Sequence, residues 1–164
     1  MLKENILGAL NKQMNAEFYN SHLYLGMAAW FESQNLPGCA HWMKLQAEEE
    51  RGHALRFYKH IVERRGTAKV DAVKAPPAAY KSPLAAFEAA LAHEDSVSAT
   101  INDIISSATD AKDYATVSFL QWFVNEQVEE EAQTDAIVQQ LRMAGESKGG
   151  LMQIDHHLGK RAAG

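Results

Sequence analysis

The sequence contains a single cysteine, Cys39, and this scarcity excludes several kinds of protein. One cysteine cannot form an internal disulfide framework or a metal site built from several thiolates. The first twenty residues meet a charged or amide side chain every few positions, so they hold no signal-peptide hydrophobic region. Together these absences predict a protein of a reducing, cytoplasmic compartment.

Long apolar runs and basic patches are missing as well. No run approaches the about 18 consecutive apolar residues of a membrane-spanning helix, so no membrane partner is expected. The net charge is −5, and the basic pairs Arg64-Arg65 and Lys160-Arg161 are too short to form a patch. A nucleic-acid partner is therefore not expected either, because the phosphate backbone requires a surface rich in Lys and Arg.

Proline and glycine are sparse, with 4 and 10 copies in 164 residues, and they interrupt the chain at only a few places. The long stretches between them predict four long helices and one short helix in a single domain, 1–164. The expected helices cover about 5–35, 39–65, 83–109, 113–144 and 150–159, with a crossover loop at 67–82. The last residues, 159–164, are expected to fray.

A heptad-like spacing of apolar residues supports these helices. In the first helix, steps of three and four connect Leu7, Leu10, Met14, Glu17, Ser21, Tyr24, Ala28 and Phe31. The other long segments have comparable stripes and no strand-like alternation competes, so the fold class is all-α. Short connections make neighbouring helices antiparallel, whereas the long connection lets the second and third helices run parallel. We expect a four-helix bundle with one long crossover and a short fifth C-terminal helix.

Each of the four stripes is interrupted near its middle by a carboxylate or an amide. The interrupting residues are Glu17, Glu50 with His53, Glu94, and Gln127 with Glu130. A buried carboxylate is costly unless it is protonated, paired or bound to a metal. For one such residue a solvated surface position is the ordinary explanation. The same interruption on four helices favours a shared site instead.

The polar residues of paired helices are expected at the same height along the bundle in one pair and at different heights in the other. Glu94 and Gln127 lie nearly equidistant from the turn at 111, so antiparallel packing brings them to one level. Reflected through a turn near residue 37, Glu50 faces Tyr24, and Glu17 is expected about two turns away. An offset between the helices, or long side chains, must close that distance.

The pair Glu50-x-x-His53 places two candidate ligands on one helix face, since residues i and i+3 are neighbours. With glutamates from the other helices, this is the arrangement of di-iron bundles. Oxygen-rich ligation with one imidazole suits iron or manganese. The alternative from a different class is a metal-free structural bundle held by buried ion pairs. That alternative needs basic partners, and none of the four stripes carries an inward-facing lysine.

Four segments carry a resemblance to a known family. They are NAEFYNSHLYLGMA, KLQAEEERGHALRF, LAHED and QWFVNEQVEEE, and the similarity extends from residue 1 to about 158. The chain resembles the bacterial non-haem ferritins, which have the ferritin-like four-helix bundle. The resemblance implies iron storage and detoxification. In this family Fe(II) is oxidised by O₂ or H₂O₂ at a di-iron ferroxidase centre, and the Fe(III) product is deposited inside a hollow homo-oligomer of twenty-four subunits.

The resemblance also implies roles for individual residues. One iron would be bound by Glu17, Glu50 and His53. The second would be bound by Glu50, Glu94 and Glu130, with Gln127 close by. The cluster Glu49, Glu126 and Glu129 matches a third iron site beside the pair. Tyr24 matches a tyrosine next to the centre that is a candidate one-electron donor, although a core tyrosine bonded to a carboxylate explains it equally well.

Differences from related families bear on whether haem is bound and on how tightly the second iron is held. A haem-binding bacterioferritin has a methionine directly after the bridging glutamate, where this chain has Arg51, so no haem is expected. The second E-x-x-H of a tightly held pair is replaced by Gln127-x-x-Glu130, which should weaken the second iron and favour turnover. Large apolar residues exceed what one stripe can bury, and we expect them to pack against neighbouring subunits. These residues are Leu25, Trp30, Phe31 and Trp42.

Overall fold

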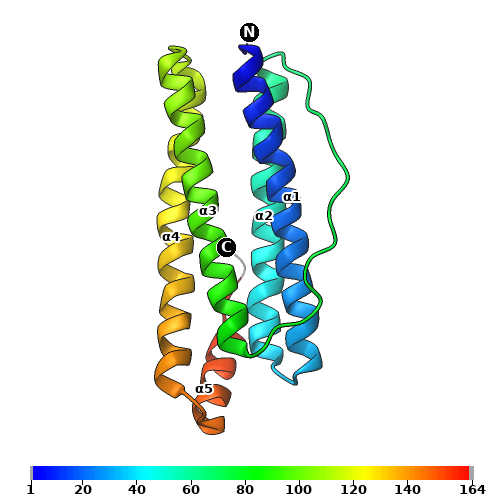
Figure 1. Cartoon of the computed structure of the whole chain (residues 1–164), viewed down its shortest axis with the longest axis vertical. Coiled ribbons are helices and arrows are strands. Elements are labelled where there is room, and N and C mark those ends of the chain that lie inside the picture. Colours follow the sequence, from blue (N-terminus) through cyan, green and yellow to red (C-terminus); the bar gives the residue numbers. More distant parts are fainter. Residues whose placement is uncertain (1, 163–164) are drawn as a thin grey trace.

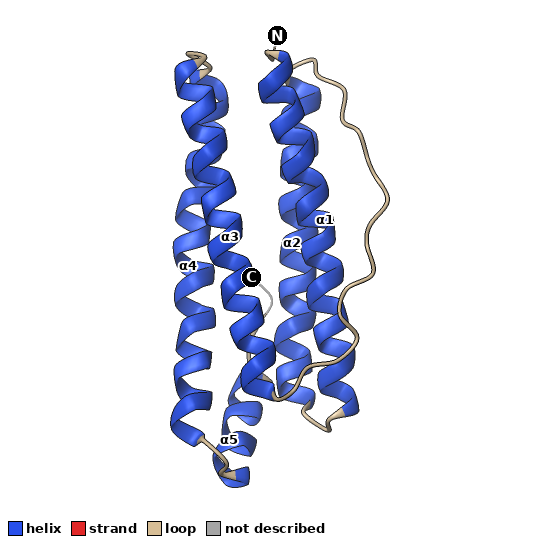
Figure 2. Cartoon of the chain, viewed as in Figure 1, coloured by secondary structure: helices blue, strands red, loops and turns tan. Residues whose placement is uncertain are grey.

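The computed structural model describes residues 2–162, and these residues form five helices and no strand (Figure 2). The helices are α1 (Glu4–Ser33), α2 (Pro37–Glu63), α3 (Pro83–Asp110), α4 (Tyr114–Ala144) and α5 (Lys148–Leu158). The all-α class expected from the sequence is confirmed. Within the described chain, no helix is both long and apolar enough to cross a membrane.

The first three helices end in the same way. Asn35, Arg65 and Lys112 each have a positive φ, of 58°, 61° and 56°, and each stands two residues after its helix. The next amide in each case bonds back to a carbonyl five residues earlier, as Gly66 N does to Ile61 O at 2.8 Å. This is the Schellman ending, and it satisfies carbonyls that the helix leaves free. It also explains why α1 and α2 end two residues before the expected ends at 35 and 65.

The bundle is built from two antiparallel pairs, α1 with α2 and α3 with α4 (Figure 1). The loop from 66 to 82 returns along the whole bundle, so α2 and α3 run parallel, as the length of that connection predicts. Ser82 begins α3 by accepting a hydrogen bond from Ala85 N at 3.1 Å, and Pro83 occupies the first helical position. Both choices are favourable at a helix start.

Two asparagines of α1 attach the crossover loop to the bundle. Asn11 donates to Thr67 O at 3.0 Å and accepts from Lys69 N at 2.7 Å. Asn15 donates to Lys69 O and accepts from Asp71 N, both at 2.8 Å. Four residues of helix rise about 6 Å, which is close to the length of two residues of extended loop. Asn11 and Asn15 can therefore bind loop residues that lie two positions apart.

The apolar core is divided into two parts by a polar layer. One part lies toward the α1–α2 turn and includes Phe31, Trp42 and Phe87. The other lies toward the opposite end and includes Leu10 and Phe57. Between them the buried side chains are carboxylates, amides and one imidazole: Glu17, Asn20, Gln46, Glu50, His53, Glu94, Gln127 and Glu130. The polar interruptions of the sequence therefore lie inside the bundle.

The short helix α5 docks against the N-terminal end of α2. Asp155 Oδ1 accepts a hydrogen bond from Cys39 N at 2.8 Å, satisfying an amide that α2 cannot pair internally. A Cβ added to Gly38 would lie 1.7 Å from Asp155 O, so this close approach requires glycine. Burial, followed by the charge of Asp155, raises the pKa of the Cys39 thiol, which is therefore an unreactive core group.

Two expectations from the sequence are wrong in detail. The C-terminal stretch does not fray up to Arg161, whose carbonyl accepts from His41 Nε2 at 2.9 Å and whose guanidinium lies 4.8 Å from the Trp42 ring centre. Residues 163 and 164 lie outside the described chain. Of the apolar residues expected at subunit contacts, Trp30, Phe31 and Trp42 fill the core of this chain instead, and only Leu25 is exposed.

Candidate metal centre

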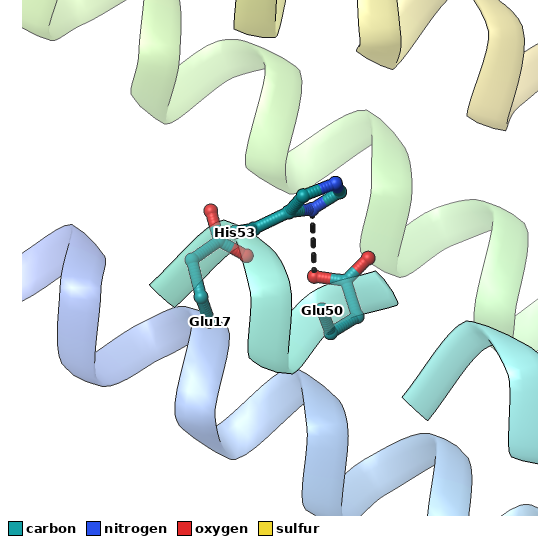
Figure 3. A group of neighbouring side chains, drawn as sticks. All are labelled: Glu17, Glu50 and His53. Atoms are coloured by element: carbon teal, nitrogen blue, oxygen red, sulfur yellow. Dashed lines mark ion pairs between the residues drawn. The ribbon is translucent and has the colours of Figure 1, made fainter. Parts of the chain in front are cut away.

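Glu17, Glu50 and His53 come together in the polar layer. Each offers a ligand atom, all within 4.8 Å of one another, and all three side chains are buried. Figure 3 shows the Glu17 side chain reaching from α1 toward the two ligands of α2. His53 Nδ1 lies 3.5 Å from Glu50 Oε2. The i, i+3 spacing on α2 places both of its groups on one face, as predicted.

The expected two-turn gap between Glu17 and Glu50 is wrong, because the turn is centred near residue 35 and not near 37. With this centre the residue of α1 that faces Glu50 is Asn20, and Asn20 does contact Glu50. Glu17 is then three residues away, about 4.5 Å at 1.5 Å per residue, which a glutamate side chain spans.

The second helix pair supplies its groups at the same level. Gln127 Nε2 donates to Glu94 Oε2 at 3.1 Å, as expected from their equal distances to the turn at 111. Tyr24 Oη donates to Glu94 Oε1, which links α1 to α3 across the centre. Glu130, His53 and Glu126 form a second group whose ligand atoms lie within 4.8 Å of one another. His53 belongs to both groups and therefore joins them.

The side chains that donate hydrogen bonds to the four buried glutamates are amides and one phenol. Glu17 accepts from Gln13 at 2.6 Å and from Asn20 at 2.8 Å, and Glu130 accepts from Gln46 at 2.7 Å. Among the described residues, no lysine or arginine bonds to Glu17, Glu50, Glu94 or Glu130. Glu50 Oε1 is buried without any hydrogen-bond partner. These contacts argue against an ion-pair core and leave negative charge that protons or a cation must balance.

The protonation of the metal-free centre follows from this shortage of positive charge. Burial, reinforced by the charge of Glu50, raises the pKa of Glu17 well above its usual value. Burial, reinforced by Glu94, does the same for the pKa of Glu50. The pKa of Glu130 rises to about 7 for the same two reasons. A bound cation would replace these protons, so metal binding and proton release are linked.

Among the described residues, the three expected at a third site do not form one group with ligand atoms within 4.8 Å of one another. Glu126 lies with His53 and Glu130. Glu49 Oε2 instead accepts from Arg161 Nη2 at 2.6 Å. Glu129 is exposed on α4. Glu49 nevertheless lies near the centre, because its charge contributes to the raised pKa of Glu130.

Apart from Gln127, the amides around the carboxylates were not among the residues predicted for the site. Gln13 and Asn20 stand four residues before and three after Glu17, so helical spacing alone could have indicated contact with it. Gln46 stands four residues before Glu50 but bonds to Glu130 on α4, and His93 contacts Asn20 on α1, so helical spacing alone predicts neither contact. His93 is partly buried, with Nε2 2.6 Å from Asn20 Oδ1.

Comparison with known proteins shows the family to which this chain belongs. The family model for the ferritin-like domain matches residues 7–144. The chain belongs to the ferritin family. The bacterial non-heme ferritin of Bacteroides fragilis (strain 638R) is 42% identical over 161 residues, which cover 98% of this chain and 100% of that protein. That of Staphylococcus aureus (strain MRSA252) is 38% identical, covering 98% and 97%.

Solved structures agree with the fold. An open pore ferritin from the archaeon Archaeoglobus fulgidus superposes with a TM-score of 0.98 at 44% identity, covering 99% of this chain and all of that one. A humanized archaeal ferritin gives a TM-score of 0.98 at 42% identity, covering 100% and 99%. This ferritin is therefore an iron-storage protein, and its carboxylate and histidine cluster is consistent with a di-iron site.

Proposed function

We propose that this ferritin oxidises Fe(II) at the centre between its four long helices and stores the Fe(III) product inside a shell. The observation that carries the proposal is the set of four buried glutamates whose hydrogen-bond donors are all neutral. Oxygen ligands with one imidazole suit iron, and the protons held by the glutamates at neutral pH are exchangeable for it.

Glu50 is the group proposed to bridge two irons. It shares a ligand cluster with Glu17 and His53, and the charge of Glu94 acts on it. Its unpaired Oε1 leaves one buried oxygen free for a second ion. The first iron would be held by Glu17, Glu50 and His53, and the second by Glu50, Glu94 and Glu130, with Gln127 close by.

The oxidation balances with either oxidant. Two Fe(II) ions give two electrons and become Fe(III). With O₂ the electrons and two protons yield H₂O₂, and with H₂O₂ they yield two waters. Iron is the substrate here, since the ferric product moves on to the store and frees the site. Tyr24, a buried phenol that donates a hydrogen bond to Glu94, remains the candidate one-electron donor beside the centre, and the balance above does not require it.

The activity is tested directly by adding Fe(II) to the purified protein in air. We expect ferric absorbance to rise faster than in buffer alone and the iron to stay with the protein during size separation. Iron that precipitates apart from the protein at the buffer rate would refute the proposal.

We predict a closed assembly of twenty-four chains, with a mass of about 440 kDa from chains of 18.2 kDa. Leu25 of α1 is exposed and available for contact with a neighbouring chain. On α2, Leu55, Tyr58 and Val62 offer a second apolar surface, since they stand three and four residues apart and each is more than 40% exposed. Light scattering measures the particle mass. A monomer or a twelve-subunit particle would contradict the prediction.

We also propose that Glu49, Glu126 and Glu129 form a third, weaker cation position. In the metal-free chain Arg161 competes for it, because its guanidinium already pairs with Glu49. Arg161→Gln should therefore strengthen binding of the third cation by about fivefold, the effect of losing a competing pair of roughly 1 kcal/mol. Crystals soaked in Fe(II) would report the occupancy of a third anomalous peak.

The exposed neighbour Lys160 provides the control for that experiment. Lys160→Gln removes the same charge from the tail without touching Glu49, so it should leave the third peak unchanged. Equal occupancy in Arg161→Gln and the wild type would show that Arg161 does not compete. Absence of the peak in all three proteins would mean that the cluster is a solvated acidic face.

A further inference from the structure

Asn20 is a buried amide of α1 that bonds to two of the proposed ligands. Its Nδ2 donates to Glu17 Oε2 at 2.8 Å and to Glu50 Oε2 at 3.3 Å. Gln13, Gln46, Gln127 and Tyr24 each bond to only one of the four carboxylates. Within the described chain, Asn20 is thus the one side chain that connects ligand carboxylates of two helices.

His93, on α3, decides which way the Asn20 amide points. Its Nε2 lies 2.6 Å from Asn20 Oδ1, and with this amide orientation His93 donates from Nε2, because an amide oxygen only accepts. The ring of Tyr19 packs against the His93 ring at 6.3 Å between centres and limits its rotation. A reversed amide would set Oδ1 against the Oε2 atoms of Glu17 and Glu50. The arrangement with Nδ2 on the carboxylates is therefore the one that all four groups favour.

The Asn20 amide can hold the two carboxylates together without neutralising their charge, which a charged residue could not do. Its two hydrogens offset the repulsion between Glu17 and Glu50 and hold their Oε2 atoms on a common donor. Lysine or arginine would also bring them together, but its full charge would neutralise them and compete with a cation. Asn20 orders the ligands and leaves their demand for positive charge intact.

We propose that Asn20 is a positioning residue of the metal centre, which presets Glu17 and Glu50 for one cation, and that His93 acts through it. The inference rests on the proposed function, in which Glu17, Glu50 and His53 bind the first iron. Partners that orient metal ligands typically contribute 10- to 100-fold to affinity, because without them the ligands must be ordered at the moment of binding.

The test is anaerobic titration of the intact protein with Co²⁺, whose visible absorption reports both binding and coordination. Asn20→Ala should weaken the first Co²⁺ by about 10- to 100-fold. His93→Phe keeps a ring beside Tyr19 but loses the donor, and should weaken binding by roughly tenfold. His93→Gln, whose amide nitrogen can replace Nε2, should restore the affinity to within about twofold of the wild type.

His22→Phe is the matched control, since His22 is an exposed histidine of α1 whose ring bonds only to Phe18 O. It should bind Co²⁺ as the wild type does. The two His93 variants keep the test decisive even if Asn20→Ala fails to fold. Wild-type affinity in both His93→Phe and Asn20→Ala, with binding lost in Glu50→Ala, would overturn the inference and leave the proposed function standing. Unchanged binding in Glu50→Ala would instead refute the ligand set itself.

Discussion

Replacing Glu50 with alanine is expected to remove the fast oxidation of Fe(II) almost completely. Glu50 lies in the cluster with Glu17 and His53, and the charge of Glu94 from the opposite helix pair acts on it. In the proposed centre, its loss would remove a ligand from both irons at once. We expect the initial rate above the buffer background to fall at least about 100-fold, beyond what loss of an orienting partner costs. Stopped-flow absorbance after mixing with Fe(II) and O₂ measures this rate.

His53→Ala gives the contrast that makes the assignment specific. His53 belongs to the first iron of the proposed pair, so its removal should slow oxidation roughly tenfold and leave the second position able to bind. Glu48→Ala is the control, because Glu48 is an exposed glutamate only two residues before Glu50 on the same helix. Its rate should match that of the wild type. If Glu50→Ala were no slower than Glu48→Ala, the bridging role would be wrong.

The fold was predictable because helical periodicity carries most of the information. Steps of three and four place apolar residues on one face, and a bundle must bury that face. The same periodicity located Glu17, Glu50 and Glu94 at mid-helix, and burial in the structure agrees with that location. A helix face is a local property of the sequence, which is why a single chain reveals it.

The distances between helices were less predictable, because they depend on how the connections are made. The predicted separation of Glu17 and Glu50 along the bundle axis was too large by about one helical turn. The residue Asn35, with its positive φ, ends α1 early and moves the centre of the turn. The contact of Arg161 with Glu49 joins residues 112 positions apart. No local pattern marks such a pair. Trp42 was misplaced for a related reason, because α5 and the C-terminal residues cover it.

The stability of the metal-free protein should depend on pH through Glu130. The pKa of this carboxyl is about 7 in the folded chain, from burial and then from the charge of Glu94, against 4.5 for the free group. Between these pH values the folded state holds a proton that the unfolded state has released. Stability is therefore full below about pH 4.5 and is lost as pH rises to about 7, by up to about 3 kcal/mol.

Glu130→Gln should remove the Glu130 contribution to this loss, while Glu17 and Glu50, whose pKa values are also raised, keep theirs. Only one oxygen of Glu130 is bonded, to Gln46 Nε2, so a glutamine can keep that bond with its own oxygen. Glu17 is a poorer choice, since both of its oxygens accept hydrogen bonds. At pH 8 the metal-free variant should be more stable than the wild type by roughly 1–3 kcal/mol, and at pH 4 equally stable. Thermal or denaturant unfolding at both pH values, on particles of equal size, measures the difference.

A bound cation should reduce the stability advantage of Glu130→Gln over the wild type, and that response separates a metal centre from an ion-pair core. A cation at about 100 times its Kd stabilises the native wild type by about 2.7 kcal/mol. Glu130→Gln, with one anionic ligand removed, should gain less, whereas the exposed control Glu48→Gln should gain as much as the wild type. An ion-pair core predicts the opposite pattern, because removing one charge of a pair exposes its partner and destabilises the protein at every pH above the carboxyl pKa. The di-iron assignment would be refuted if Glu130→Gln were destabilised at pH 8 and if the wild type, Glu130→Gln and Glu48→Gln all failed to respond to a redox-inert divalent cation. The buried glutamates would then owe their stability to something other than a cation.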